Sequence, residues 1–309
     1  MNCSGEVNEL VQLFQLVVYI PIFIIGLIIN ALALWAFCWK LRKWTETTIY
    51  VINLAVSDTV LLFSLPFKIF SSKKWTRNSI PLCIFAESLY FVNMYASIFI
   101  ITCISVDRYI AIKHPFRAKA LRSPKKAAAL CATIWIIICS CSVFIYQKYI
   151  HQLSKEKIDC FQQVSFEDDI YATVPLCIVG FMIPLIIVTF CSVQIIQALR
   201  QSKMTNSGEL TTTKTLRIIA TSAIIFAICF TPVHIGYFLQ WLPTFNEDCS
   251  RRQYVNSFLQ VSTCIANINC CLDGFGYYFV STEVCEIFKL QLKKPKNLIA
   301  TSNIVTICT

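Results

Sequence analysis

Seven apolar runs recur along this chain of 309 residues, and each is long enough to cross a lipid bilayer as a helix. The hydrocarbon layer is about 30 Å thick, which a helix crosses with about 20 residues. Buried helices of a soluble protein are the alternative, but seven such lengths in one chain disfavour it. The runs show no alternation of apolar and polar residues, which disfavours a membrane β-barrel. We therefore predict an all-α fold, a seven-transmembrane helix bundle, with spans at residues 13–39, 49–70, 83–112, 127–146, 174–199, 216–239 and 255–279.

The distribution of basic residues predicts the orientation. With the N-terminus outside, Lys and Arg are concentrated in the inner connections and the tail, and such an excess marks the cytoplasmic side. We predict an extracellular N-terminus at 1–12, a membrane domain at 13–279, and a cytoplasmic tail at 280–309 that begins with a short interfacial helix. The net charge of +10 then reflects topology and attraction to anionic lipid, so no nucleic-acid partner is predicted.

The outer side carries candidate modification sites. Asn2 opens an N-glycosylation sequon, and the first residues lack the basic region of a signal peptide. The cysteines on the predicted outer side, where disulfides are permitted, are Cys3, Cys83, Cys160 and Cys249. Four cysteines allow three pairings. Cys83 with Cys160 would tie the third span to the long outer loop, and Cys3 with Cys249 would tie the N-terminus near the seventh span.

Enzymatic and metal chemistry find no support in the sequence. The three histidines, His114, His151 and His234, fall in separate places, without a base–nucleophile pairing or a Walker-type phosphate loop. No pair of cysteines has the spacing of a zinc site with suitably placed histidines. A transporter or channel is the alternative from another class, but inverted repeats, broken helices and charged pore rings are not visible.

Four short motifs resemble those of rhodopsin-like (class A) G-protein-coupled receptors. In the family's order, they are NLAVSD at 53–58, DRY at 107–109, CFTP at 229–232 and NCCLDGFGY at 269–277. Stretches around Trp44 and at 121–135 are similar to G-protein-coupled receptor 35, and those at 64–68 and 232–240 to G-protein-coupled receptor 55. The resemblance covers nearly the whole chain. It implies a plasma-membrane receptor that activates heterotrimeric G proteins, binds arrestin and is not an enzyme.

The resemblance also implies a switch at the inner end of the third span. Asp107 is expected to hold Arg108 in the resting state, and Arg108 to contact Gα once span six has moved outward. Tyr109 and Tyr277 belong to the same switch. Residues that match the family's packing switch between the pocket and the cytoplasmic half are Ile98, Pro184, Phe226, Phe230 and Pro232.

A polar core is expected near the middle of the membrane. The residues that match the family's sodium and water cavity are Asp58, Asn93, Ser97, Asn269 and Asp273. Their oxygen donors suit a hard cation, so an allosteric sodium ion is the expected cofactor, with a hydrogen-bonded core that binds no specific ion as the alternative. The sequence departs from the family at Gly274, where proline is usual, which suggests bending through glycine instead. Phe230 replaces the usual tryptophan, and Ser192 the tyrosine low on span five.

The resemblance places a ligand pocket in the outer half, at Lys68, Glu87, Tyr90, Met94, Tyr95, His234, Tyr237 and Gln240. Tyr90 stands where amine receptors carry a carboxylate, so amine agonists are not expected. Lys68 suits an anionic headgroup, and Glu87 could pair with it. Met94 replaces an arginine of the receptor-35 pattern, which favours an anionic lysophospholipid such as lysophosphatidylinositol over a small organic acid.

Signalling partners are expected from the same branch. The resemblance suggests coupling to Gα12/13, with Gq or Gi as alternatives. Hydroxyl residues in the third inner loop and tail could be phosphorylated to recruit arrestin. Cys285 is a candidate palmitoylation site.

Overall fold

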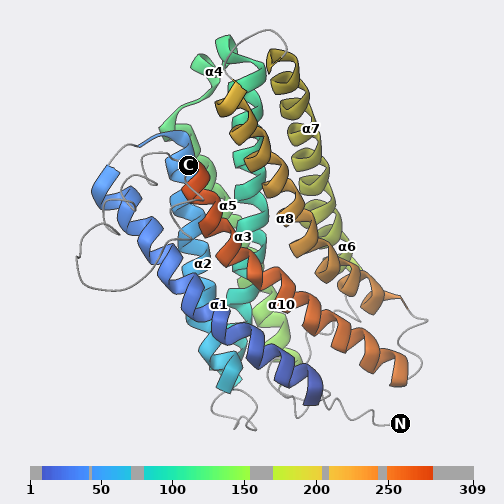
Figure 1. Ribbon diagram of the computed structural model, residues 1–309. Helices are drawn as coiled ribbons and strands as arrows, with labels where there is room; N and C mark the ends of the chain where they lie inside the picture. Colours follow the sequence, from blue (N-terminus) through green and yellow to red (C-terminus); the bar gives the residue numbers. More distant parts are fainter. Residues whose placement is uncertain are drawn as a thin grey trace.

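The computed structural model of the chain describes residues 9–41, 44–70, 80–153, 170–203, 209–242 and 249–280. These ranges form long helices joined by short connections, without a strand (Figure 1). The helices are α1 (Glu9–Trp35), η1 (Ala36–Leu41), α2 (Glu46–Phe70), α3 (Ile80–Lys113), α4 (Pro115–Leu121), α5 (Pro124–Leu153), α6 (Ile170–Cys177), η3 (Ile178–Met182), α7 (Ile183–Lys203), α8 (Glu209–Trp241) and α10 (Cys249–Val280).

The predicted seven spans are confirmed, and the helices extend beyond them. Helix α1 with η1 forms the first span, and α2, α3, α5, α8 and α10 form the second, third, fourth, sixth and seventh. The fifth span consists of α6, the π-helical turn η3 and α7 in direct succession. Helix α3 contacts α2, α5 and α7, whereas α10 contacts α1, α2 and α8, so the ends of the chain close the bundle (Figure 1).

The outer surface of the bundle is apolar, as a lipid environment requires. On α5, Ile136, Ile137 and Phe144 are each more than half exposed. Among the described residues, six helices have the length and hydropathy of membrane spans. Helix α10 has the length but is less apolar, because it carries polar residues such as Ser262, Asn267 and Asn269. These side chains are buried against the neighbouring helices, so they do not face lipid.

Buried polar side chains join helices that are distant in sequence. The amide of Asn30 on α1 donates to the carbonyl oxygen of Cys270 on α10, at 3.0 Å. The indole of Trp135 on α5 donates to Oδ1 of Asn53 on α2, also at 3.0 Å. Hydrogen bonds between membrane helices contribute about 0.6–2 kcal/mol each, so these links help to set the helix register.

The π-helical turn in the fifth span has a local cause. Pro184 has no backbone N–H, so the carbonyl of Gly180, four residues earlier, loses its helical donor. A π-turn accommodates such a defect. A Cβ atom at Gly180 would lie 2.6 Å from Cε1 of Tyr95 on α3, so only glycine permits this approach of the turn to α3.

Gly274 has a packing role in α10. A Cβ atom at this position would overlap the side chain of Ile29 on α1. The helix is continuous through residue 280 and packs closely against α1 at this position. Bending through Gly274 stays a prediction. The proline that is usual in the family would carry the same Cβ atom, so this helix pair could not accept it without separating.

We expect Gly274→Ala to lower the free energy of unfolding by about 1–3 kcal/mol, because the added methyl group overpacks the contact with Ile29. The measurement is the apparent Tm of the detergent-solubilised protein. In an Ile29→Ala background the same substitution should cost much less, since most of the overlapping side chain is gone. An equal cost in both backgrounds would contradict the packing explanation.

Candidate functional site

Asp107 is bound by Arg122, not by its neighbour Arg108. Nε of Arg122 donates to Oδ1 of Asp107 at 2.7 Å, and Nη2 donates to Oδ2 at 3.0 Å. Nη2 also lies 3.4 Å from Oε2 of Glu46 at the start of α2. The hydrogen bonds with Asp107 raise the pKa of the Arg122 guanidinium above its ordinary value. Among the described residues Asp107 forms its ion pair with Arg122, and it acts on Arg108 only through a longer-range electrostatic attraction. The direct pair of Asp107 and Arg108 that we expected for the resting state is not formed in this structure.

This arrangement follows from the short connection between α3 and α5. Pro115 begins α4 and Pro124 begins α5, and the short segment between these helices places Arg122 beside the end of α3 that carries Asp107. Arg108 is partly exposed, and no ion pair of its guanidinium is found within the described ranges. Tyr109 points elsewhere, with its hydroxyl 3.3 Å from Nε2 of His114 and its ring against Phe190 of α7.

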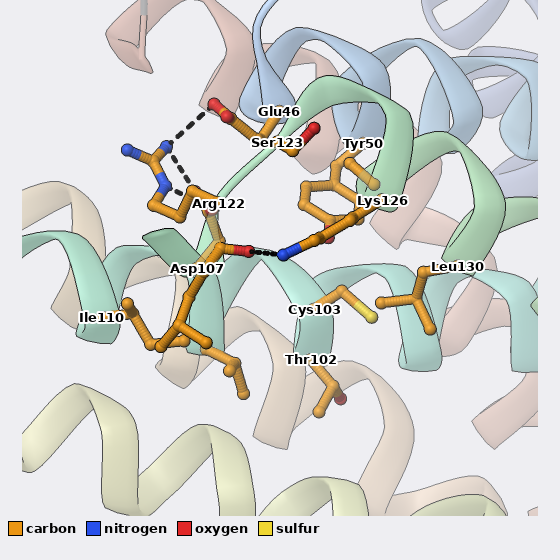
Figure 2. Close-up of a pocket in the computed structure, with 13 residues that line it drawn as sticks. Glu46, Tyr50, Thr102, Cys103, Asp107, Ile110, Arg122, Ser123, Lys126 and Leu130 are labelled. Carbon is orange, nitrogen blue, oxygen red and sulfur yellow. Dashed lines mark hydrogen bonds and ion pairs between the residues drawn. The ribbon is translucent and has the colours of Figure 1, made fainter. Parts of the chain in front are cut away.

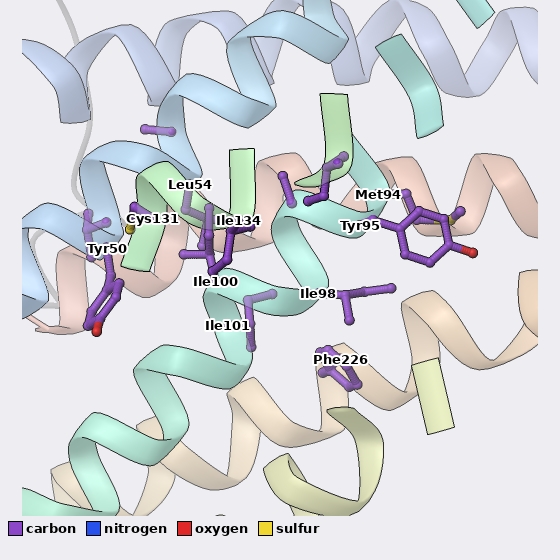
Figure 3. Packing of buried hydrophobic residues seen from close by; sticks show 14 of the residues in the cluster. Tyr50, Leu54, Met94, Tyr95, Ile98, Ile100, Ile101, Cys131, Ile134 and Phe226 are labelled. Carbon is purple, nitrogen blue, oxygen red and sulfur yellow. The ribbon is translucent and has the colours of Figure 1, made fainter. Parts of the chain in front are cut away.

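The residues of the predicted packing switch lie together in the core. Ile98 and Phe226 are fully buried, and Phe230 is 2% exposed. The rings of Phe226 and Phe230 meet edge to face, with centroids 5.2 Å apart. Ile98 and Phe226 belong to the same buried cluster (Figure 3). Pro184 is buried in α7, and Pro232 lies inside α8. Because proline has no backbone N–H, each of these two helices lacks one hydrogen-bond donor close to the cluster.

The predicted polar core is assembled from three helices. The amide of Asn93 donates to Oδ1 of Asp58 at 3.3 Å, and that of Asn269 donates to Oδ2 of Asp273 at 2.5 Å. Oγ of Ser97 and Oδ1 of Asn269 are buried and accept no hydrogen bond in the described part of the chain. Such oxygens lack the compensation that burial demands. They fit a hard cation or a water, so the donor set suits the expected sodium ion.

Three of the predicted pocket residues belong to an aromatic cluster around His234. Nδ1 of His234 lies 2.7 Å from the carbonyl oxygen of Phe230, which can only accept, so Nδ1 carries the proton. Nε2 of the neutral ring then accepts from the hydroxyl of Tyr95, at 3.3 Å. Phe181 stacks on the imidazole with centroids 4.1 Å apart, and Tyr237 meets it edge-on.

Lys68 forms a second group with two tyrosines. Its Nζ lies 4.8 Å from the ring centroid of Tyr90 and 5.1 Å from that of Tyr19. Ammonium groups are attracted to aromatic faces within about 6 Å. Glu87 lies near enough to interact electrostatically with the ammonium group. A cation is thus held among aromatic rings between α1, α2 and α3.

Met94 and Gln240 stay predictions as ligand contacts, and the structure buries both side chains. Met94 is 9% exposed and packs within the apolar core. Gln240 donates from Nε2 to Oδ1 of Asn256 at 2.9 Å, which links α8 to α10. Its side chain thus has a structural role that sequence patterns did not indicate.

Several predicted sites lie outside the described residues. They are Asn2, Cys3, Cys160, Cys285, the interfacial helix and most of the phosphorylation sites, together with the side chains of Cys83 and Tyr277. Cys249, at the start of α10, is disulfide-bonded. Its predicted partner Cys3 is not described, so the pairing stays a prediction.

Comparison with known proteins agrees with this geometry. The family described as 7 transmembrane receptor (rhodopsin family) matches residues 29–277. The chain belongs to this family. It is 40% identical to human G-protein coupled receptor 55 over 297 residues, covering 91% of each chain. It is 35% identical to human G-protein coupled receptor 35, covering 88% of this chain and 85% of that one.

Chicken lysophosphatidic acid receptor 6 is 35% identical over 302 residues, covering 94% of this chain and 97% of the relative. The receptor is therefore a multi-pass membrane protein near the branch of receptors 35 and 55, and heterotrimeric G proteins are its partners. Its family and relatives are receptors and not enzymes, which confirms that prediction. The family match also disfavours the alternative that the chain is a transporter or channel.

Sequence patterns missed four side chains of these sites. Tyr19 of α1 and Phe181 of η3 complete the groups around Lys68 and His234. Arg122 and Glu46 hold Asp107. Arg122 stood out only as one of several basic residues in the second inner loop, a pattern that membrane topology alone explains.

Proposed function

We propose that the receptor lies in the plasma membrane with its N-terminus outside, binds an anionic lysophospholipid, and activates Gα12/13. The observation that carries the ligand class is the ammonium group of Lys68, held over the rings of Tyr90 and Tyr19. A phosphate group gains a charge-assisted contact there. A relative named for lysophosphatidic acid supports the same chemistry. An acyl chain would pack toward the aromatic cluster of Tyr95, Phe181 and His234.

Side-chain packing between the His234 cluster and the Arg108 end of the bundle suggests how ligand binding could be transmitted to the G-protein side. A ligand that displaces the rings around His234 acts directly on Phe230, whose carbonyl oxygen His234 binds. Phe230 contacts Phe226, and Pro232 weakens the α8 backbone beside them. We propose that this shift moves the inner half of α8 outward. Arg108, which forms no ion pair with Asp107 in this structure, then contacts the Gα carboxyl terminus.

The test uses the full-length receptor in lipid nanodiscs with purified Gα subunits and βγ. Lysophosphatidylinositol and lysophosphatidic acid should each be assayed for GTPγS uptake on Gα13, Gαq and Gαi. We expect stimulation on Gα13 to exceed that on the others. Stimulation by a small organic acid alone would contradict the ligand class, and a preference for Gαq or Gαi would contradict the coupling. Antibody access to an N-terminal tag on intact cells tests the orientation, and agonist-dependent arrestin recruitment tests that partner.

A sodium ion is the proposed cofactor of the polar core. Asp58, Ser97 and Asn269 would hold it, with Asn93 and Asp273 around them. The ion supplies a positive charge that compensates the buried carboxylate, and it favours the inactive state if it binds that state more tightly.

We expect NaCl, relative to N-methylglucamine chloride at equal ionic strength, to raise the apparent Tm of the ligand-free receptor. Ser97→Ala should remove most of this increase, since it deletes an oxygen ligand. Ser105→Ala, at a hydroxyl that already donates to the carbonyl of Ile101, serves as the control and should retain it. A sodium response that is equal in all three proteins would contradict the site.

A further inference from the structure

A cavity of ≈ 380 Å³ lies between α2, α3 and α5, at the end of the bundle that carries Asp107. Figure 2 shows the charged side chains of Glu46 and Arg122 on one side of it, and the uncharged side chains of Cys103 and Leu130 on another. The wall beyond the charges is largely apolar, with Val106, Ile110, Leu121, Ala127 and Leu130. The cavity thus combines a polar rim with an apolar interior.

The apolar side of the cavity continues onto the lipid-facing surface. Leu130 at its mouth is 43% exposed, and Leu121 is 54% exposed. Ile137 and Phe144 follow Leu130 at seven-residue spacing, so the three side chains form one stripe along α5. Ile137 and Phe144 are also exposed, on a helix that spans the membrane. A hydrocarbon chain in the bilayer can therefore lie along this stripe and enter the cavity.

The polar rim retains hydrogen-bond donors after its internal contacts are made. A guanidinium group has five N–H donors. Nε and Nη2 of Arg122 serve Asp107 and Glu46, which leaves the two donors of Nη1. Lys126 directs Nζ to the carbonyl oxygens of Ala120 and Leu121, at 3.2 and 3.4 Å, and an ammonium has a third donor. A group with several acceptor oxygens, such as phosphate, can use these donors without breaking the contacts to Asp107.

The charge around the rim favours an anion. The positive charges of Arg122 and Lys126 together balance the two carboxylates, Asp107 and Glu46, that line the cavity. The segment between Arg108 and Lys155 contains no acidic residue, whereas it carries exposed basic residues on α4 and at the start of α5. Basic residues beside a span attract anionic headgroups, each by about 1 kcal/mol near the surface.

We propose that this cavity is a second ligand site, which takes an anionic phospholipid of the cytoplasmic leaflet. The phosphate binds Arg122 and Lys126, and an acyl chain follows Leu130, Ile137 and Phe144. Bound lipid adds a partner to Arg122 while it holds Asp107, so it stabilises the arrangement in which Asp107 is withheld from Arg108. The inference rests on the proposed orientation, but it requires neither the extracellular ligand nor a particular Gα.

The test is displacement of fluorescent phosphatidylinositol 4-phosphate from the detergent-purified full-length receptor. We expect Lys126→Ala to weaken binding about fivefold, from the loss of one phosphate contact. Lys126→Arg should retain binding. The matched control is Lys125→Ala, which removes the same charge one residue away from a side chain that does not line the cavity. It should weaken binding less than roughly twofold. Leu130→Trp should obstruct the mouth and also weaken binding.

The competitors identify what the site recognises. Unlabelled phosphatidylinositol 4-phosphate should displace the probe, whereas phosphatidylcholine and the free phosphoinositol headgroup should do so far less well. Equal displacement by the free headgroup or by inorganic phosphate would overturn the lipid assignment. Equal displacement by phosphatidylcholine, or equal losses for Lys125→Ala and Lys126→Ala, would overturn the site in favour of general attraction. Because no agonist or Gα is present, these outcomes are independent of the GTPγS assay.

Discussion

Arg108→Ala should reduce agonist-evoked GTPγS uptake by the cognate Gα at least about 30-fold, since the loss of one partner of a desolvated charged contact costs about 2 kcal/mol or more. Arg108 lies near the C-terminal end of α3, and its guanidinium forms no ion pair with any described residue. Its removal therefore breaks no ion pair among the described residues. Surface level and apparent Tm should stay near those of the wild type.

Arg122→Ala is the matched comparison, because it removes a guanidinium that binds the same end of α3. Asp107 then becomes available to Arg108, so we expect signalling to fall without being abolished. The apparent Tm should also fall, since the links from Arg122 to Asp107 and Glu46 are lost. Equal effects of both substitutions on signalling, or full signalling by Arg108→Ala, would contradict the assigned role of Arg108.

Lys68→Met should raise the agonist concentration needed for half-maximal response about 30-fold or more for an anionic lysophospholipid. Methionine keeps most of the apolar stem and removes the charge that lies over Tyr90 and Tyr19. A neutral monoacylglycerol of the same chain length should lose little, because it makes no ionic contact. Competition binding with the two ligands, performed on the same membranes, measures the difference.

Tyr90 offers a second comparison for the same contact. Tyr90→Phe keeps the aromatic face beneath the ammonium group, whereas Tyr90→Leu removes it. We expect the leucine variant to lose affinity for the anionic lysophospholipid and the phenylalanine variant to change it little. Equal losses of the charged and neutral ligands on Lys68→Met would show that Lys68 maintains the pocket shape and does not bind a headgroup.

The architecture was predictable because the membrane limits what a chain can do. An apolar run of more than 20 residues has to satisfy its backbone internally, so each such run is read directly as a helix. The family followed from four motifs in order, since residues such as Asp58, Arg108 and Pro232 are recognisable by their neighbours in the sequence. The same matches assigned Tyr95 and His234 to the pocket and Phe226 to the packing switch. In the structure Tyr95 contacts His234, and Phe226 contacts Phe230.

Partner choice was not predictable in the same way. Asp107 stands next to Arg108 in the sequence, yet the connection between α3 and α5 turns so that Arg122 donates to both oxygens of the carboxylate. Gln240 was expected in the ligand pocket, and only the structure shows that its side chain also binds Asn256 of α10. At Gly274 the decisive neighbour is Ile29, which lies at the other end of the chain.

The sequence by itself determined the seven spans, the family and the side chains that can bear charge within the membrane. Only the tertiary structure decided which of those side chains meet, because a contact depends on helix register and on turns between distant segments. The cavity beside Arg122 shows the difference clearly, since α2, α3 and α5 each contribute a wall to it and none of their sequences predicts it.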